Sequence, residues 1–283
     1  MKLVTWNIQW CLGCDGVVDP QRIVDEARAF ADFDVLCLQE VASNYPALKG
    51  SRGEDQFAAI AAALPGYTAV PGIAVDVAAP DGSRRRFGNM ILSRLPVLQV
   101  LRVQLPWPAD PAVRSMPRVL LEAMLQTPFG PLRVMTTHLE YYSATQRAAQ
   151  LDALRGRHAE ACGHALAHGV RDTSNGPFHT QPQTVSAILT GDFNFRPDDP
   201  LHARLTAPFD GNAVPALEDV WQTLHPGAAQ PPTTGVHDRA QWPEAFACDF
   251  IYASADLRPR LHAIAVDAAT QASDHQPMMV ELG

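Results

Sequence analysis

Short apolar runs that end in polar side chains recur along this sequence, and they limit what the chain can fold into. Residues 185–189 form one such run, and Asp192 and Asn194 follow it closely. An apolar run of this length is typical of a buried strand, and strand side chains two positions apart point the same way. A carboxylate and a carboxamide are therefore expected together at a sheet edge, although Gly-Asp-x-Asn is also ordinary turn chemistry.

Further runs of the same kind carry other polar groups. Three of these runs end on a polar residue: residues 2–7 on Asn7, residues 35–40 on Glu40 and residues 132–138 on His138. Residues 246–252 enclose Asp249. Asp274 and His275 precede the last expected strand, residues 277–282. Each group alone has a structural explanation, because polar residues are common where strands end. The whole set favours one functional site, since ligands of layered α/β folds bind at strand ends.

The ordered set resembles the endonuclease/exonuclease/phosphatase superfamily of magnesium-dependent enzymes, which cleave phosphoester bonds. The resemblance spans residues 2–275 and depends on Trp6-Asn7, Leu38-Gln39-Glu40, Thr137-His138-Leu139, residues 191–194, Asp249 and Ser273-Asp274-His275. The His138 motif is more similar to the phosphatase and sphingomyelinase-like branches than to the DNA-repair branch, in which a tyrosine usually serves near that position. The resemblance implies an α/β fold, a four-layer αββα sandwich of two mixed β-sheets flanked by helices.

The order of expected elements is compatible with that sandwich but does not single it out. Three helices are predicted: from Asp19-Pro20 to about Ala31, over residues 56–64, and from a Ser143 cap to about His168. Residues 67–137 are predicted to form consecutive strands, with turns at Asp81-Gly82 and at residues 129–131. No shift in composition marks a domain boundary. Residues 1–283 are therefore expected to form a single domain.

The resemblance implies a Mg²⁺ site, in which Mn²⁺ is a possible substitute. Magnesium suits one or two carboxylates with further ligands from water and phosphate. Glu40 is the first candidate for a direct ligand, with Asn7 beside it through oxygen or water and Asp274 completing the charge. The alternative for Glu40 is a solvated strand end.

In the similar enzymes, the residue corresponding to Asp192 orients and deprotonates the attacking water. An ordinary aspartate has a pKa of about 3.9 and is a weak base, so its effect would come from its position and its neighbours. Asn194 is expected to donate a hydrogen bond to phosphate or to complete the ligand shell of the metal. Its side chain could at the same time form an Asx-turn that stabilises the loop before Pro197. A second metal bound by Asp192 and Asn194 stays open.

The resemblance also implies that His275 binds a non-bridging phosphate oxygen and is held by Asp249. An aspartate within an apolar run needs a partner, because burying an unpaired charge is costly. The alternative for Asp249 is a salt bridge to Arg239 or Arg258. His138 is expected to face phosphate too, although a lone histidine at a strand end is more often structural.

Other polar residues are weaker candidates. Asn89 and Arg147 are expected at the substrate rim, and a surface ion pair explains Arg147 equally well. Gln9 follows Asn7 by two positions and could share its face. His158, His164 and His168 recur along the expected long helix, where a solvated helix face is favoured over metal binding.

Composition bears on the substrate. The formal charge is −8, from 22 basic and 30 acidic residues, and the lysines are Lys2 and Lys49 alone. Phosphate contacts of DNA-binding proteins depend on lysine and arginine, so a small or lipid-like phosphoester is preferred over nucleic acid. Trp107 and Trp242 are candidates for an apolar docking surface. The alternatives are a DNA endonuclease or exonuclease of the same superfamily and a non-catalytic protein that binds a phosphorylated ligand.

The expected cellular location also follows from apolar patterning. No apolar run is long enough to span a membrane, and the first expected strand begins at Lys2. That start leaves no room for a cleavable signal sequence. A cytoplasmic protein is therefore expected.

Overall fold

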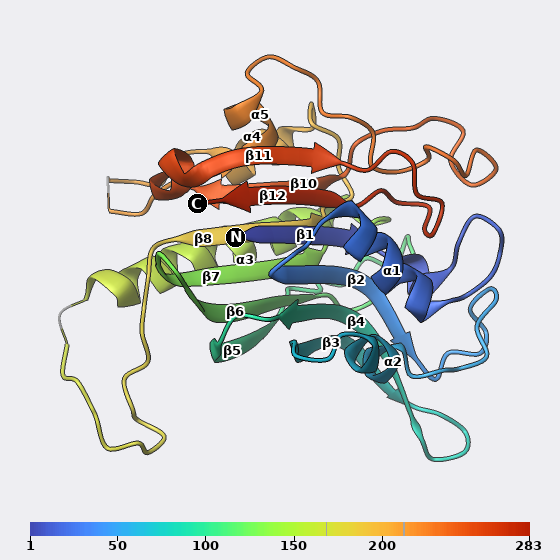
Figure 1. Ribbon diagram of the computed structural model, residues 1–283, viewed down its shortest axis with the longest axis horizontal. Coiled ribbons are helices and arrows are strands. Elements are labelled where there is room, and N and C mark those ends of the chain that lie inside the picture. The colour runs from blue at the N-terminus through green and yellow to red at the C-terminus, as the bar shows by residue number, and fades with distance from the viewer. Residues whose placement is uncertain (168, 212) are drawn as a thin grey trace.

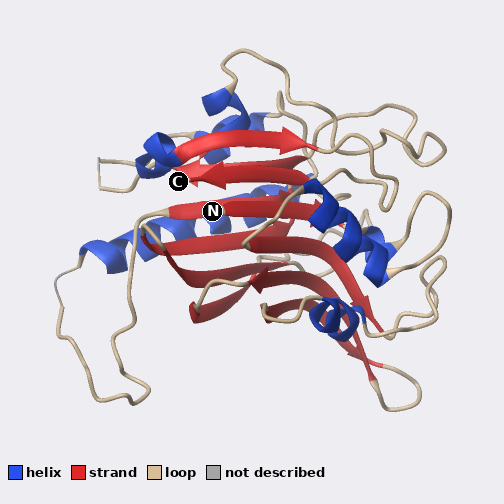
Figure 2. Cartoon of the chain, viewed as in Figure 1, coloured by secondary structure: helices blue, strands red, loops and turns tan. Residues whose placement is uncertain are grey.

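Two six-stranded β-sheets form the centre of the molecule, and helices cover their outer faces (Figures 1 and 2). The computed structural model describes residues 1–167, 169–211 and 213–283. In spatial order, the strands of the first sheet are β11 (Leu261–Val266), β12 (Met278–Leu282), β1 (Lys2–Asn7), β2 (Val35–Ser43), β4 (Arg84–Ser93) and β3 (Thr68–Ala78). Those of the second sheet are β5 (Val97–Gln104), β6 (Val119–Thr127), β7 (Gly130–His138), β8 (Ala187–Asp192), β10 (Asp249–Ser254) and β9 (Leu217–Asp219).

Both sheets are mixed. The pairs β1–β2 and β7–β8 are parallel, and every other strand pair is antiparallel. Parallel neighbours need a crossover connection, usually a helix. The helix α1 (Pro20–Phe30) connects β1 to β2, and α3 (Ala144–Leu166) connects β7 to β8. Each crossover brings two strand ends to the same edge of its sheet.

The helices begin where the sequence predicts. The Asp19 side chain caps α1 and accepts hydrogen bonds from the backbone N–H groups of Gln21 and Arg22, with Pro20 as the first helical residue. The Ser143 hydroxyl caps α3 in the same way, and both are favoured N-cap residues. The remaining helices are α2 (Gln56–Ala63), α4 (Pro200–Thr206), α5 (Val220–Leu224) and the 3₁₀ turns η1 (Gln9–Cys11) and η2 (Ala255–Arg260). His168, the expected end of the long helix, lies outside the described residues.

Three apolar clusters lie between the layers. The cluster between the sheets combines Leu3, Val35 and Ile91 of the first sheet with Leu121, Val134 and Ile188 of the second. A second cluster packs α1 and α2 on the first sheet, and a third packs α3 and α4 on the second. In Figure 1, α1 and α2 lie in front of the sheets and α3 lies behind them. The predicted four-layer αββα sandwich is therefore confirmed.

Three local expectations were wrong. The strand β2 continues past Glu40, which lies in an irregularity of the β2–β4 pairing and has a φ of 61°. Asp249 begins β10 rather than lying inside a strand, because Phe246 pairs with Thr234 outside the sheet. The expected solvated helix face holds for His164, but His158 is fully buried against the second sheet.

None of the helices in the described residues has both the length and the apolar character that a membrane-spanning segment needs.

Candidate active site

A cleft of about 440 Å³ opens where the ends of β1, β7 and β8 meet. Six of the residues expected from the sequence line it: Glu40, His138, Asp192, Asn194, Asp274 and His275. Asn7 and Asp249 are buried directly behind this lining and hydrogen-bond to it. The structure thus brings together the polar groups that follow distant apolar runs.

Strand register explains how the second sheet contributes its side chains. His138 at the end of β7 pairs with Asp192 at the end of the parallel strand β8. Asp192 in turn pairs with Asp249 at the start of the antiparallel strand β10. Three neighbouring strands therefore present an imidazole and two carboxylates at one edge.

Asn7 joins the two sheets at this edge. Its amide Nδ2 donates to Asp192 Oδ2 at 2.9 Å and to Glu40 Oε1 at 3.2 Å. Its Oδ1 accepts from the backbone N–H of Gln9 at 3.1 Å. The amide nitrogen of Asn7 therefore holds the two carboxylates in place, while its oxygen accepts a hydrogen bond from the backbone.

Burial and neighbouring charges shift the pKa values of two carboxylates of the cleft. Burial raises the pKa of Glu40 to about 7, the negative charge of Asp274 adds to the rise, and His275 and Asn7 oppose it. Burial and the neighbouring Asp249 likewise raise the pKa of Asp192 to about 6, against hydrogen bonds from Asn7 and the Asn194 backbone. Close negative charges disfavour ionisation, so a cation at this place would stabilise the ionised forms.

His275 is held by Asp249. Its Nδ1 lies 2.8 Å from Asp249 Oδ2, and the Thr233 hydroxyl donates to the same oxygen at 2.6 Å. Burial lowers the pKa of His275, but the charges of Asp249 and Asp274 outweigh it and leave this pKa well above its usual value. The proposed arginine partners of Asp249 are not used: Arg258, for example, bonds to Glu218.

His138 contacts one carboxylate from each sheet. Its Nε2 is 3.5 Å from Asp192 Oδ2, and its Nδ1 is 3.8 Å from Glu40 Oε1. Burial, then the positive charges of Arg118 and His275, hold the pKa of His138 well below its usual value. The pKa values of the two imidazoles of the cleft are therefore shifted in opposite directions.

A long loop before β10 closes over Asp274. The side chains of Gln241 and Trp242 both donate to Asp274 Oδ2, at 2.9 Å each. Gln9 lines the cleft and donates to Gln241 Oε1 at 3.2 Å. Sequence reasoning missed these contacts of Gln241 and Trp242, because nothing in a loop sequence indicates where its side chains point.

Arg118 is a further residue that sequence reasoning missed. It lines the cleft immediately before β6, is 6% exposed, and its Nε donates to Glu140 Oε2 at 3.3 Å. A signal for it exists in the sequence, since Arg118 adjoins the apolar residues 119–121 just as Asn7 and His138 adjoin their runs.

The two residues expected at the substrate rim do not line the cleft itself. Asn89 is buried, donates to the Val119 carbonyl at 3.1 Å, and lines a small cavity that it shares with Arg118 and His138. Arg147 lines a neighbouring groove, and its Nη1 donates to the carbonyls of Glu140 and Tyr141 at 2.8 Å. The expectation of a rim position was wrong for Asn89, and Arg147 supports backbone rather than facing the cleft.

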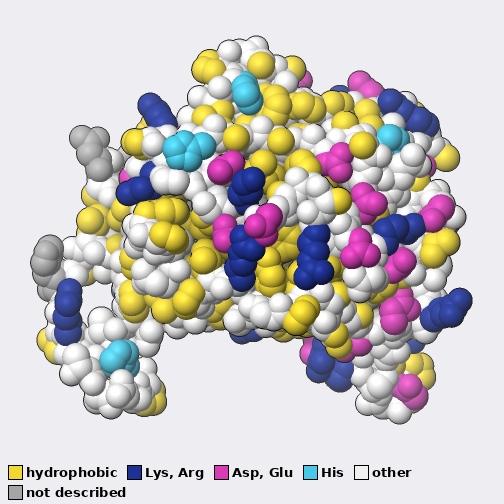
Figure 3. All heavy atoms as spheres, viewed as in Figure 1, with side chains coloured by type: hydrophobic (Ala, Val, Ile, Leu, Met, Phe, Trp, Pro, Cys, Tyr) yellow, Lys and Arg dark blue, Asp and Glu magenta, His cyan; other side chains and the backbone are white. Residues whose placement is uncertain are grey.

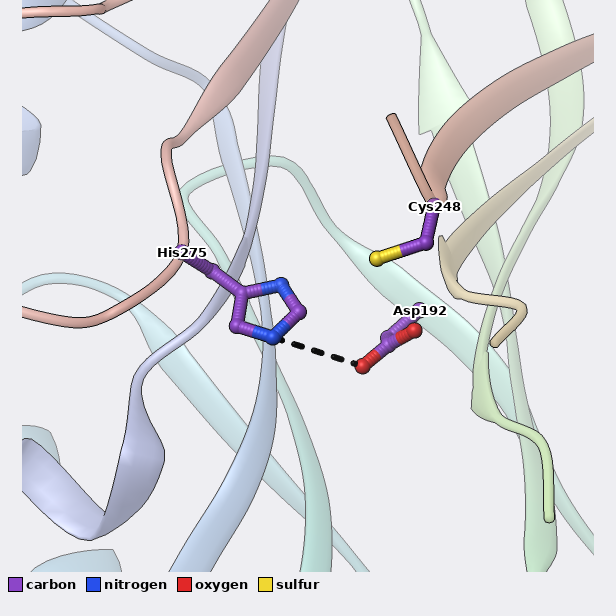
Figure 4. A group of neighbouring side chains, drawn as sticks. All are labelled: Asp192, Cys248 and His275. Carbon is purple, nitrogen blue, oxygen red and sulfur yellow. Dashed lines mark ion pairs between the residues drawn. The ribbon is translucent and has the colours of Figure 1, made fainter. Parts of the chain in front are cut away.

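Several side chains of the cleft carry atoms that could bind a metal ion. Asp192, Cys248 and His275 place possible ligand atoms within 4.8 Å of one another, and Figure 4 shows His275 and Asp192 facing each other with the Cys248 thiol beside them. Burial raises the pKa of Cys248 well above its usual value, and thiol sulfur is a soft donor that suits Mg²⁺ poorly. Glu40, Asp192 and Asp274 all line the cleft, and their oxygens are the hard donors that Mg²⁺ prefers, so the chemistry of these side chains suits that ion.

Solved structures share this architecture. An endonuclease/exonuclease/phosphatase from Beutenbergia cavernae is 25% identical over 100% of this chain and 72% of its own, with a TM-score of 0.71. D. rerio TDP2, complexed with single strand DNA product, is 19% identical over 100% of this chain and 98% of its own, with a TM-score of 0.65. A mannosyl-6-phosphatase from Bacteroides thetaiotaomicron is 17% identical over 100% of this chain and 99% of its own, with a TM-score of 0.63.

Sequence comparison gives the family. Among curated proteins, none matches the chain. The profile of the Endonuclease/Exonuclease/phosphatase family matches residues 4–275. This span includes every residue of the cleft named above and ends on His275. The chain therefore belongs to the endonuclease/exonuclease/phosphatase family.

Proposed function

We propose that this protein hydrolyses phosphoesters with the help of Mg²⁺, by in-line attack of a water molecule activated by Asp192. The observation that carries the proposal is the pair of hydrogen bonds from Asn7 to Asp192 and Glu40. These bonds bring a candidate base and a candidate metal ligand, one from each sheet, into a single cleft.

Glu40 and Asp274 are the residues that would hold Mg²⁺, with Asn7 fixing the carboxylates, and Mn²⁺ suits the same oxygen donors. When bound, such an ion supplies positive charge to the phosphate and its leaving oxygen. The raised pKa of Glu40, caused by burial and by Asp274, supports this assignment, because it reflects a site in which negative charge lacks compensation.

Asp192 would orient the attacking water and accept its proton. One Asp192 oxygen accepts from the Asn194 backbone at 2.9 Å and the other from Asn7 at 2.9 Å, so the carboxylate is fixed in one orientation. Its pKa of about 6, raised by burial and by Asp249, makes it a better base than an ordinary aspartate. General bases act best when their pKa is near the working pH. A second metal held by Asp192 and Asn194 remains the other reading of these two residues.

His275 would donate its Nε2–H to a non-bridging phosphate oxygen. Asp249 accepts the hydrogen bond of Nδ1 and keeps the ring protonated, which leaves the Nε2–H available to the cleft. His138 would offer phosphate a hydrogen bond from a neutral ring. A protonated donor stabilises the negative charge that grows in the transition state. Asn194 donates its amide to the Leu139 carbonyl at 2.9 Å, and it would complete the wall beside the phosphate.

A small or lipid-like phosphoester is the proposed substrate. The net charge of −8 disfavours a long polyanion, and on the face shown in Figure 3 acidic and basic side chains are interspersed rather than gathered into a basic stripe. The cleft is closed on one side by Trp242 and carries Tyr141 and Tyr142 at its rim. Both tyrosines are 44% exposed, which suits an uncharged group attached to the phosphate.

Nucleic acid is the second candidate substrate, and the same aromatic rim favours it. Exposed aromatic rings can stack on bases of single strands without a large basic surface. The similar TDP2 structure is described as complexed with single strand DNA product. A DNA endonuclease or exonuclease acting at single-stranded ends would use this rim.

Hydrolysis of bis-(4-nitrophenyl) phosphate, measured with Mg²⁺ and with EDTA, tests the reaction. We expect turnover with Mg²⁺ alone, and we expect Asp192→Asn and His275→Ala each to abolish it without unfolding the protein. Asp198→Asn, on the exposed surface, is the matched control for the loss of a carboxylate. Wild-type rates in either variant would contradict the assigned roles, and no turnover under any condition would favour a non-catalytic protein that binds phosphorylated ligands. Nicking of plasmid or abasic DNA separates the two substrate classes.

A further inference from the structure

Arg118 is a buried charge whose hydrogen bonds are incomplete. It is 6% exposed and lies in the wall of the cleft with Glu40, His138 and Asp192. A guanidinium taken out of water is costly unless its N–H groups find acceptors. The contacts of Arg118 therefore indicate what this residue is placed to bind.

Glu140 is the acidic partner of Arg118, but only one of its two carboxylate oxygens bonds to Arg118. Its Oε2 accepts from Arg118 Nε at 3.3 Å, whereas its Oε1 accepts from the Tyr142 backbone N–H at 2.9 Å. Within the described residues, the buried Arg118 Nη1 has no hydrogen-bond partner. An unsatisfied buried donor costs free energy. Because Nη1 itself is closed to solvent, a ligand in the cleft would meet the guanidinium at the atoms by which Arg118 lines the cleft.

The surroundings of Arg118 restrict the ligand to an anion. Burial lowers the pKa of Arg118, and the charges of Glu140, Glu40 and Asp192 oppose that change, so the side chain remains cationic. A planar guanidinium matches the oxygens of phosphate in geometry and charge.

We propose that Arg118 binds a non-bridging oxygen of the substrate phosphoryl group, as a catalytic residue in addition to His275 and His138. The inference rests on the proposed phosphoesterase function and deepens it. Arg118 would neutralise phosphate charge in a cleft that it lines together with Glu40, His138 and Asp192. Because the donor is oriented before substrate arrives, it would stabilise the transition state without reorganisation.

The supports of Arg118 keep it in place. The Glu140 backbone N–H donates to Gln150 Oε1 at 2.8 Å, so α3 holds the acidic partner. The Asn89 amide donates at 3.1 Å to the carbonyl of Val119, the residue that follows Arg118. Glu140 and Asn89 are therefore positioning residues for Arg118. This role gives a function to Asn89, which the sequence assigned to the rim.

Arg133 provides a matched control. It is a fully buried arginine, and its Nη1 also lacks a hydrogen-bond partner among the described residues. It lies on the outer face of the second sheet, where its Nη2 is 2.8 Å from His158 Nδ1 of α3, and it does not line the cleft. Replacing it shows the effect of losing a buried arginine that has no access to substrate.

The experiment compares Arg118→Gln, Arg118→Lys and Arg133→Gln in the full chain with Mg²⁺. Inorganic phosphate is the probe for binding, measured by the rise in unfolding temperature, and bis-(4-nitrophenyl) phosphate is the probe for turnover. We expect phosphate to stabilise the wild type and Arg133→Gln but not Arg118→Gln. We expect kcat/KM to fall about 100-fold in Arg118→Gln, to be partly retained in Arg118→Lys, and to follow only the folded fraction in Arg133→Gln.

Addition of ethylguanidinium to Arg118→Ala gives a second measurement, and we expect it to restore part of kcat. Phosphate stabilisation of Arg118→Gln equal to that of the wild type would overturn the inference. So would a loss of activity that matches the loss of folded protein. The two proposals fail separately. An inactive wild type that still needs Arg118 to bind phosphate contradicts the hydrolase, whereas a wild-type kcat/KM in Arg118→Gln contradicts only the role of Arg118.

Discussion

Trp242 connects a loop to the floor of the cleft through one hydrogen bond. Its indole Nε1 donates to Asp274 Oδ2 at 2.9 Å, and Gln241 donates to the same oxygen. The two donors fix the orientation of a carboxylate that we assign to the metal. In metal sites, partners of this kind orient the ligands and tune their affinity.

Trp242→Phe keeps an aromatic ring and removes this donor. We expect the affinity for Mg²⁺ or Mn²⁺ to fall about tenfold, measured by isothermal titration calorimetry without substrate. Trp221→Phe is the control, because the Trp221 indole donates to the Ala228 carbonyl at 3.2 Å outside the cleft. An unchanged affinity in Trp242→Phe would show that the hydrogen bond to Asp274 has no part in metal binding.

His158 is a buried residue whose protonation opposes folding. Its Nδ1 accepts from Arg133 and its Nε2–H donates to the Pro215 carbonyl, so the neutral ring fits both partners. Burial and the charge of Arg133 lower the pKa of His158 to about 4. The pKa of histidine in the unfolded chain is about 6.5.

Stability is expected to fall as the pH drops between these two values. In that window the unfolded chain binds a proton that the folded chain does not, which costs up to about 1.4 kcal/mol per pH unit. His158→Gln should show a smaller loss of unfolding free energy between pH 7 and pH 4.5 than the wild type, measured by urea titration. His164→Gln, on an exposed side chain, should keep the wild-type slope, and an equal slope in His158→Gln would refute the argument.

At the level of single residues, the sequence predicted the strand-end part of the site. Asn7, His138 and Asp192 end strands. The meeting of His138 and Asp192 follows from the parallel pairing of β7 and β8, whereas Asn7 reaches them from the other sheet. Trp242 and Thr233 could not be predicted in these roles, because each contacts the site from a loop whose path depends on long-range packing. Arg118 directly precedes β6, so its place at a strand end could have been predicted from the sequence in the same way.

At the level of elements, β2 and the β7–β8 pair have local features that the pattern of apolar residues does not predict. The irregularity in β2 gives Glu40 a φ of 61°, a conformation that residues other than glycine rarely adopt. A hydrophobic pattern gives no sign of it, because the apolar residues on both sides continue the strand. The expected strand ended at Glu40, whereas the real strand runs on to Ser43.

The close packing of β7 against β8 depends on Gly191. Its φ is 141°, and a Cβ at this position would lie 1.9 Å from the Thr137 carbonyl oxygen. Gly191→Ala must therefore push apart the two strands that carry His138 and Asp192. We expect it to lower the free energy of unfolding by more than about 2 kcal/mol and to abolish turnover.

Gly156→Ala is the opposite case in the same protein. Gly156 lies in α3, and a Cβ there would meet nothing within 4 Å. Alanine in a helix is expected to raise the free energy of unfolding by about 0.5–1 kcal/mol, with turnover unchanged. Urea unfolding measures both variants, and equal stability of Gly191→Ala and the wild type would show that β7 and β8 can separate at little cost.

At the scale of the whole molecule, residue patterns alone did not choose the architecture. Alternating helices and strands are compatible with several layered folds, and the four-layer arrangement was predicted through the resemblance to a family. The missing information is which sheet each strand joins. For example, β4 and β5 are neighbours in sequence yet belong to different sheets.

The two sheets depend on each other, and this supports the proposal that residues 1–283 form a single domain. One apolar cluster takes side chains from both sheets, and the cleft takes Glu40 from the first and Asp192 from the second. Neither sheet could keep its inner face buried alone. A domain with one shared core is expected to unfold in one cooperative transition.

Hydrogen exchange of backbone amides tests this expectation in each sheet separately. Amides at the centres of β2 and β7 should exchange with the same free energy of opening, since both need global unfolding. Leu121→Ala, which removes a side chain from the cluster between the sheets, should lower both values equally, by about 2–5 kcal/mol. If β2 kept its protection while β7 lost it, the sheets would be separate folding units, and the site between them would form only when the two units dock.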